Sequence, residues 1–365
     1  MKKSRYTLKG DAAFDKMLDK YLEDISEAVE QSSVSKDIAA IVLGGGYGRG
    51  EGGVFETADG QKKLYNDLDF FVIAKNINHV KLKKMDKVLA SLGKSFSREL
   101  GIDVDFGPAK NRRQLTKMPF TMMWQELREG HIVIYGAKDV LNTLPDYDLH
   151  DLPRSEGLRL LLNRGAGLLF ARQKLKQKNI SVEGRNFIGC NLNKAVLACG
   201  DVFLILRNKY CLSVQDRLAL LEEFDAELAR PYRKAVQFKL SPEIYSIQKL
   251  LKLLEDVMTL FEKQCLHFFS ICYGIAISNQ QELNIALKRK DPFAQGLGSK
   301  ELMKNFLENI LCSQQLEHNL LFSTASPRLK LLHFLLGLLF EHYHHNDYTN
   351  SVEEKKFLMC WNKLN

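Results

Sequence analysis

Residues 38–54 read IAAIVLGGGYGRGEGGV, an apolar run followed at once by a glycine-rich loop. The apolar residues 38–43 predict a short buried strand. Seven of the ten residues from Gly44 to Gly53 are glycine. Glycine costs conformational entropy on folding, so such a density needs a reason. One reason is close approach of backbone N–H groups to phosphate oxygens, which a side chain would block. The loop therefore predicts a phosphate-binding turn, with a flexible hairpin as the alternative.

The loop matches neither of the two common glycine-rich nucleotide motifs. No Lys-Ser/Thr pair follows it, as a P-loop requires. A Rossmann G-x-G-x-x-G would lead into a helix and then to an acidic residue on a second strand. Arg49 adds a permanent cation, which we expect either to fork onto a phosphate or to pair with Glu51.

Two D-x-D patterns follow the loop. The segment NDLDF opens a strand predicted at 68–74, and IDVDF is a further strand. Alternate residues of a strand point to the same face, so Asp67 lies beside Asp69, and Asp103 beside Asp105. Neighbouring carboxylates repel each other unless a cation lies between them, and Mg²⁺ takes carboxylate and phosphate oxygens. All four are therefore candidate metal ligands; the alternative is an ordinary half-buried strand with acids facing solvent.

Together these residues resemble the nucleotidyltransferase superfamily, which includes DNA polymerase beta, kanamycin nucleotidyltransferase and the glutamine synthetase adenylyltransferases. The family has a strand, then Gly-Gly or Gly-Ser, then D-x-D on the next strand and a third acid on a later one. Gly45 and Gly46 with Arg49 are similar to the first element. The resemblance covers roughly residues 35–140. It departs from the family where Gly46 replaces a common Ser, and in an insertion, FETADGQKKL, that looks like a hairpin tip.

The acids match the remaining elements of the family pattern. Asp67 and Asp69 match the D-x-D, and Asp103 best matches the third acid, with Asp105 as the competing candidate. The resemblance implies a mixed sheet, Mg²⁺ and an NTP donor, with ATP expected. It implies transfer of NMP to a hydroxyl and release of pyrophosphate. Asp103 would complete the site and accept the proton of the acceptor hydroxyl, while the glycines and Arg49 would hold the triphosphate.

The character of the chain changes after about Pro153. Before it, strand and helix patterns alternate; after it, apolar residues recur every three or four positions and strand signals disappear. We therefore predict an α+β protein, with a nucleotidyltransferase-type domain at 1–150 and an all-helical domain at 151–365 that completes the nucleotide and acceptor site. The expected helices of the first domain are 11–31, 79–92 and 121–129, and its expected strands are 38–43, 68–74, 102–106 and 131–135. The expected helices of the second are 155–178, 187–209, 214–229, 242–264, 265–278, 300–312, 327–345 and 352–363, with breaks at Pro231, Pro242, Pro292 and Pro327.

The net charge of +8 is unevenly distributed. Residues 1–150 hold 23 Lys/Arg and 22 Asp/Glu, whereas residues 151–365 hold 29 and 22. The second part therefore favours an anionic ligand, with a solvated lysine-rich surface as the alternative. Within it, Lys194 is the first candidate to hold the triphosphate or acceptor and Arg164 the second. The alternative for Lys194 is an ion pair with Asp201, seven residues away on the same helical side.

Three interpretations of function remain open. The first is the transferase, acting on a small molecule, a protein hydroxyl or an RNA 3′ end. The second is a non-catalytic nucleotide-binding regulator or toxin–antitoxin-type module, and the third is an RNA-acting protein that uses the basic helical half. Scattered cysteines and the absence of a signal-like N-terminus or a long apolar run predict a cytoplasmic protein outside membranes. His342, His344 and His345 are expected at the surface end of a helix rather than as a metal site.

Overall fold

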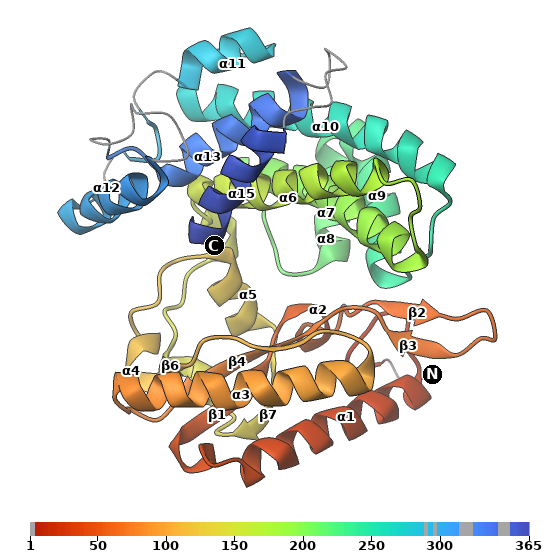
Figure 1. Cartoon of the computed structure of the whole chain (residues 1–365), viewed down its shortest axis with the longest axis vertical. Coiled ribbons are helices and arrows are strands. Elements are labelled where there is room, and N and C mark those ends of the chain that lie inside the picture. The colour runs from red at the N-terminus through yellow and green to blue at the C-terminus, as the bar shows by residue number, and fades with distance from the viewer. Residues whose placement is uncertain (1–3, 288–290, 295–297, 314–323, 342–350, 365) are drawn as a thin grey trace. The chain divides into compact units, whose positions relative to one another are not determined.

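The structure, a computed structural model, describes residues 4–287, 291–294, 298–313, 324–341 and 351–364. The chain forms two compact units (Figure 1). Unit 1 comprises Met1–Leu152, Cys211–Leu218 and Val236–Glu243, and unit 2 comprises Pro153–Tyr210, Ala219–Ala235 and Ile244–Asn365. The first segment of unit 1 ends two residues after the predicted boundary. The two later segments that belong with it were not predicted.

Unit 1 is built around a mixed five-stranded sheet with the order β5-β4-β1-β7, and β6 also pairs with β4. β1 is antiparallel to β4 and β7, whereas β4 is parallel to β5 and β6. The strands are β1 (Ile38–Leu43), β4 (Leu68–Ala74), β5 (Val104–Phe106), β6 (Lys110–Asn111) and β7 (Ile132–Gly136). The predicted mixed sheet is confirmed, and β6 is additional. The hairpin in the insertion is also confirmed, as β2 (Val54–Glu56) and β3 (Lys62–Leu64).

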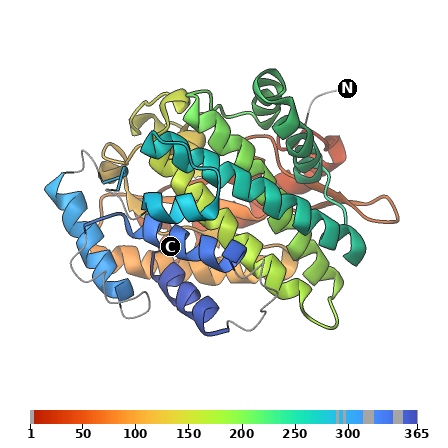
Figure 2. The ribbon, with the colours of Figure 1, turned by 90° about the horizontal axis from the view of Figure 1, so that it is seen from above.

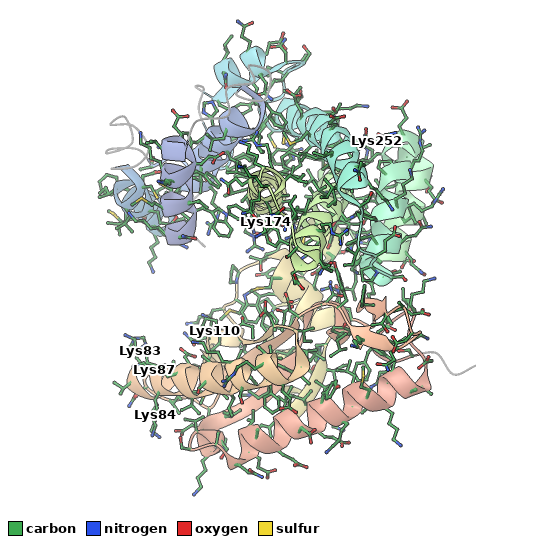
Figure 3. All side chains as sticks on the ribbon, turned by 45° about the vertical axis from the view of Figure 1, so that its right-hand side comes forward. Lys83, Lys84, Lys87, Lys110, Lys174 and Lys252 are labelled. Carbon is green, nitrogen blue, oxygen red and sulfur yellow. The ribbon has the colours of Figure 1, made fainter. Side chains whose placement is uncertain are left out.

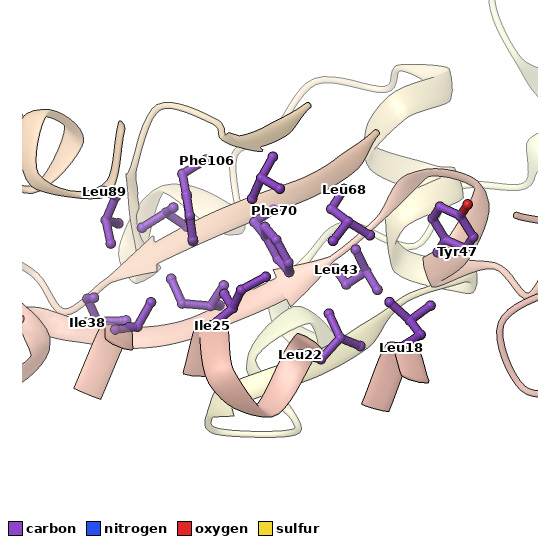
Figure 4. Close-up of a cluster of buried hydrophobic side chains, with 14 of the residues drawn as sticks. Leu18, Leu22, Ile25, Ile38, Leu43, Tyr47, Leu68, Phe70, Leu89 and Phe106 are labelled. Carbon is purple, nitrogen blue, oxygen red and sulfur yellow. The ribbon is translucent and has the colours of Figure 1, made fainter. Parts of the chain in front are cut away.

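Helices cover both faces of this sheet. On one face lie α1 (Ala12–Gln31) and α3 (His79–Leu100), whose apolar residues enter one core with alternate residues of the strands. Figure 4 shows this core between the helices and the sheet, with Ile25 of α1 near Phe70 and Leu18 of α1 near Tyr47. On the other face, α4 (Arg112–Leu115) and α5 (Met122–Glu129) contribute to a second core. The continuous apolar run of β1 follows from this double cover, because its alternate residues enter different cores.

Unit 2 is formed by helices in the residues described (Figure 2). Helix α8 (Val214–Phe224) begins, and helix α9 (Ala226–Leu240) ends, in the two short segments that belong to unit 1. The helices are α6 (Arg154–Leu175), α7 (Val182–Leu206), α8 (Val214–Phe224), α9 (Ala226–Leu240), α10 (Ile247–Tyr273), α11 (Gln280–Leu287), α12 (Ser299–Ser313), α13 (Pro327–Leu336) and α15 (Ser351–Leu364). Among the described residues, α7 alone has the length and apolar composition of a membrane span. However, 78% of its apolar window is buried inside the structure, as in the core helix of a bundle.

Two predicted helix breaks are wrong. Pro231 lies inside α9, and the chain instead breaks at Asp225, whose side chain accepts the Leu228 N–H at 2.9 Å. A capping aspartate thus defines the helix start, and Pro231 follows early enough to remove only one hydrogen bond near that end. The expected break between residues 264 and 265 is absent, because α10 runs continuously to Gly274, where φ is +65°.

Candidate active site

The four predicted acids lie on one face of two neighbouring strands. The register of β4 and β5 pairs Asp69 with Asp105. Asp67 and Asp103 lie two residues earlier, where the Leu68 N–H donates to the Asp103 carbonyl at 2.9 Å. All four carboxylates are exposed, whereas the apolar residues between them are buried or half-buried. The predicted alternation is confirmed, and strands about 4.8 Å apart bring the two pairs side by side.

Gly45 brings the glycine-rich loop against this face. The loop forms a short helical turn, α2 (Gly45–Gly48), directly after β1. The Gly44 N–H donates to the Asp69 carbonyl at 2.9 Å. Gly45 has a φ of +62°, and a Cβ at this position would lie 2.6 Å from Asp69 Oδ2. Glycine is therefore required by the backbone conformation and by the close approach of the carboxylate. Gly46 lies in the same turn, and its carbonyl accepts the Glu51 N–H at 2.8 Å.

The hydroxyl of Tyr47 holds the chain in place just before β4. Its buried side chain donates to the Gly53 carbonyl at 2.7 Å and accepts the N–H groups of Tyr65 and Asn66 at 2.9 and 3.3 Å. Burial raises the pKa of Tyr47 to about 12; backbone hydrogen bonds oppose this shift and the charge of Asp67 adds to it. The hydroxyl therefore remains protonated at neutral pH. Sequence reasoning missed this residue, although a single aromatic among glycines was a possible signal.

Arg49 forms an ion pair that was not predicted. Its Nη1 lies 2.9 Å from Oε2 of Glu126, a residue of α5, and both side chains are about 15% exposed. Arg217 Nη1 lies 3.8 Å from the other oxygen of Glu126. The Arg49 Nε is buried without a hydrogen-bond partner in the part of the chain that is described. The expected pairing of Arg49 with Glu51 is wrong, because Glu126 is closer in space; its contact with a triphosphate stays a prediction.

Glu51 instead binds residues far away in the sequence. Its Oε2 lies 2.7 Å from Lys239 Nζ, and its Oε1 accepts the Val214 N–H at 2.7 Å. Burial raises the pKa of Glu51, but Lys239, the Val214 N–H and Arg217 outweigh it, so the pKa lies below its ordinary value. Burial lowers the pKa of Lys239, and the charge of Glu51 opposes that shift. We call Arg49, Glu51, Glu126, Arg217 and Lys239 the buried charge cluster.

The candidates of the helical half lie in unit 2. Lys194 is half-buried on α7, and Arg164 is half-buried on α6. Asp201 is buried and accepts a hydrogen bond from the Tyr232 hydroxyl at 2.8 Å. A role for Lys194 or Arg164 in holding nucleotide or acceptor stays a prediction. The three C-terminal histidines, 342, 344 and 345, lie outside the described residues.

Mg²⁺ is the cation that the four acids of this face, which we call the strand face, were predicted to hold. Among the described residues, no group of three or more His, Cys, Asp or Glu side chains is arranged to hold a metal ion. However, Mg²⁺ usually keeps several waters and is bound through one or two carboxylates plus substrate phosphates. Asp67 and Asp69 match the one or two carboxylates of such a partial shell: both are exposed, and Asp69 Oδ2 lies 2.6 Å from the position that a Cβ on Gly45 would take. Binding of Mg²⁺ at these acids stays a prediction.

The chain has no match among protein-family models, curated proteins or solved structures. The geometry of the four acids and of the glycine-rich turn is therefore what points to a function.

Proposed function

We propose that this protein is a Mg²⁺-dependent nucleotidyltransferase. It transfers NMP from an NTP, with ATP as the expected donor, to a hydroxyl of its acceptor and releases pyrophosphate. One observation carries the proposal: β4, β5 and the residue directly before each strand present four exposed carboxylates side by side, and Gly45 packs against Asp69 at their edge. Carboxylates concentrated in this way repel each other, and a divalent cation with a bound triphosphate relieves that repulsion.

Asp67 and Asp69 are the proposed ligands of the metal. When bound, Mg²⁺ supplies positive charge that offsets the charge developing on the phosphates. Gly45 and Gly46 carry no side chains, so phosphate oxygens can approach the N–H groups of the turn, where the first turn of a helix leaves donors without intrahelical acceptors. Tyr47 acts as a positioning residue, since its hydroxyl fixes the chain that leads into Asp67.

The third carboxylate accepts the proton of the acceptor hydroxyl. As that proton moves to Asp103 or Asp105, the hydroxyl oxygen forms a bond to the α-phosphorus. The bond from the α-phosphorus to its bridging oxygen breaks, and pyrophosphate leaves with the electron pair. Asp103 lies beside Asp67, and Asp105 is paired in register with Asp69, so both remain candidates for this role.

The test is turnover of α-phosphate-labelled NTPs with Mg²⁺, followed as labelled acceptor or as slow release of NMP. The Asp67→Asn, Asp69→Asn double variant is expected to lose activity by a factor on the order of 1,000 or more, because charge at the transferring phosphate is no longer offset. The matched control is Asp216→Asn, Asp256→Asn, which makes the same charge change at exposed positions elsewhere. A folded Asp67/Asp69 variant with full activity would contradict the proposal.

Calorimetry separates this proposal from non-catalytic nucleotide binding. Tight NTP binding that Asp67→Asn, Asp69→Asn abolishes, with no product after hours, would keep the site but replace the transferase by a regulator. Release of labelled NMP that depends on both residues supports transfer.

A further inference from the structure

Unit 1 separates its positive and negative charges. The stretch from Lys75 to Lys117 contains 11 Lys/Arg against 4 Asp/Glu. In contrast, α1 contains 6 Asp/Glu against 2 Lys/Arg. The near-neutral total of residues 1–150 therefore conceals a strongly basic region around the start of α3 and the segment that follows β5.

Six cations of this region form one surface. Asn111 Oδ1 accepts the Ile77 N–H at 2.9 Å, and Asp86 Oδ1 accepts the Ala109 N–H at 2.8 Å, so the start of α3 is joined to β6 and α4. Figure 3 shows the labelled lysines of α3 and β6 gathered at the same end of α3. We call the set the α3–α4 basic surface; it consists of Lys83, Lys84, Lys87, Lys110, Arg112 and Arg113.

These side chains are available to a partner. Lys110 is half-buried and the other five are exposed. Across the residues that the structure describes, none of the six forms an ion pair, whereas the neighbouring Lys81 lies 3.1 Å from Asp37. Lys83 and Lys87 are one helical turn apart, an arrangement of like charges that destabilises a helix. A polyanion bound across the surface would remove this repulsion.

The fold favours phosphodiesters over a lipid surface. The apolar side of α3, with Met85, Leu89 and Gly93, is buried in the core of unit 1. The helix therefore has no apolar side to insert into a bilayer, as membrane-surface helices do. Lysines and arginines spread over two elements instead suit a chain of phosphates, which such cations neutralise one by one, and each arginine presents a fork to a phosphate.

We propose that the α3–α4 basic surface binds the phosphodiester backbone of a nucleic acid. The surface lies at the end of β4 where β6 pairs with Ile73 and Ala74. Asp69 lies five residues earlier on the strand, about 17 Å away at 3.3 Å per residue. Binding therefore does not depend on the carboxylate face, so it can succeed or fail separately from the proposed transferase activity.

The experiment measures fluorescence anisotropy of labelled single-stranded RNA and DNA of about 20 nucleotides, with the full-length protein, between about 50 and 200 mM salt. Lys83→Glu, Lys84→Glu, Lys87→Glu is expected to weaken binding about tenfold or more. It should also reduce the slope of log affinity against log salt by about 2, because each lost contact to a single strand contributes about 0.7. The matched control is Lys16→Glu, Lys234→Glu, Lys252→Glu, which changes the charge equally at exposed sites outside the basic stretch and should alter affinity less than about threefold.

A higher affinity for RNA than for DNA would identify RNA as the partner. Equal affinities would show that the surface binds both nucleic acids. The proposal is overturned if neither oligonucleotide binds at about 50 mM salt, or if both triple variants lose affinity equally. It is also overturned if the protein binds phosphatidylserine vesicles through these lysines but binds no oligonucleotide. Should the glutamate variant not fold, the glutamine variant of the same three lysines provides the same comparison without reversed charge.

Discussion

Two sets of charged side chains lie beside the glycine-rich turn α2. One set is paired within the protein, and the other is exposed to solvent. The buried charge cluster holds Glu51 in a buried position and Glu126 in a half-buried one, each within hydrogen-bond distance of a cation of the same chain. The acids of the strand face are exposed and gathered on one side of two strands. The first set joins α2 and α5 to segments far along the chain. The second set concentrates negative charge where solvent and ligands can reach it.

This difference separates the charges near the glycine-rich loop that pair within the protein from those to which the proposed function assigns ligand binding. Arg49 and Glu51 lie within the loop itself, yet their partners, Glu126 and Lys239, belong to the protein. A buried acid that keeps its charge needs such partners, because burial without them costs several kcal/mol. Asp67 and Asp69 are exposed to solvent, where the proposed metal can reach them.

The largest expected effect is the loss of stability in Glu51→Gln. The change leaves the Lys239 ammonium in a nearly buried position without its carboxylate, and removes a charged acceptor from the Val214 N–H. Breaking such a pair costs about 3–5 kcal/mol. Urea unfolding measures this loss, and Glu56→Gln, at an exposed position of β2, should change the free energy of unfolding by less than about 0.5 kcal/mol.

The same variant has a defined pH dependence. Because the pKa of Glu51 is lower in the folded protein than its ordinary value of 4.5, its charge stabilises the fold above that value. This contribution disappears as the pH falls through the folded pKa. The difference between wild type and Glu51→Gln should therefore be largest near neutral pH and shrink below pH 4.5. A difference that stays constant over this range would show that the charge of Glu51 is not the source of the stability.

The next effect concerns the contact between the glycine turn and the strand face. Gly45→Ala places a Cβ 2.6 Å from Asp69 Oδ2 at a φ of +62°. We expect a loss of about 2–4 kcal/mol, from a left-handed backbone and from the displaced carboxylate. Gly60→Ala is the matched control, because Gly60 has a φ of +80° with open space around it; it should lose only about 1–2 kcal/mol. Thermal or urea unfolding measures both variants. If they lose the same free energy of unfolding, the Asp69 carboxylate moves away from the new Cβ at no cost.

A smaller effect is expected for Tyr47→Phe. The variant keeps the buried ring but removes the hydroxyl, which donates to the Gly53 carbonyl and accepts hydrogen bonds from the Tyr65 and Asn66 N–H groups. Leaving these buried groups without a partner costs about 1–3 kcal/mol. Tyr147→Phe, where the ring is 40% exposed, should be nearly neutral and is the control for urea unfolding. A neutral Tyr47→Phe would show that water replaces the hydroxyl.

Local patterns predicted the strand face well. Apolar and acidic residues alternate in NDLDF and IDVDF, and the structure places the acids outside and the apolar residues inside. The strand β1 and the helix α1 were predicted equally well, because the spacing of apolar residues within each element indicates its type. The helical turn at Gly45 was not expected, since a run of glycines carries no periodic signal.

The sequence alone did not predict which residues far apart in the chain form ion pairs. Glu51 and Lys239 are 188 positions apart, and no local period links them. Arg49 and Glu126 are 77 positions apart and meet only because α5 covers the sheet beside the glycine turn. The same limitation explains why Cys211–Leu218 and Val236–Glu243 were assigned to the helical half: their composition is helical, but their contacts are with unit 1.

The smallest expected effect on stability is that of Asp67→Asn, Asp69→Asn, measured without Mg²⁺ or nucleotide. Both side chains are exposed, so their loss should change the free energy of unfolding by less than about 0.5 kcal/mol. At low ionic strength the variant should be slightly more stable than the wild type, because two negative charges are removed from a face that also carries Asp103 and Asp105. Salt should remove this difference in stability. Urea unfolding at low and high salt measures it. A loss of more than about 1 kcal/mol would place these acids with the buried charge cluster as structural groups. The distinction between the two sets of charges would then fail at the residues on which the proposed activity depends.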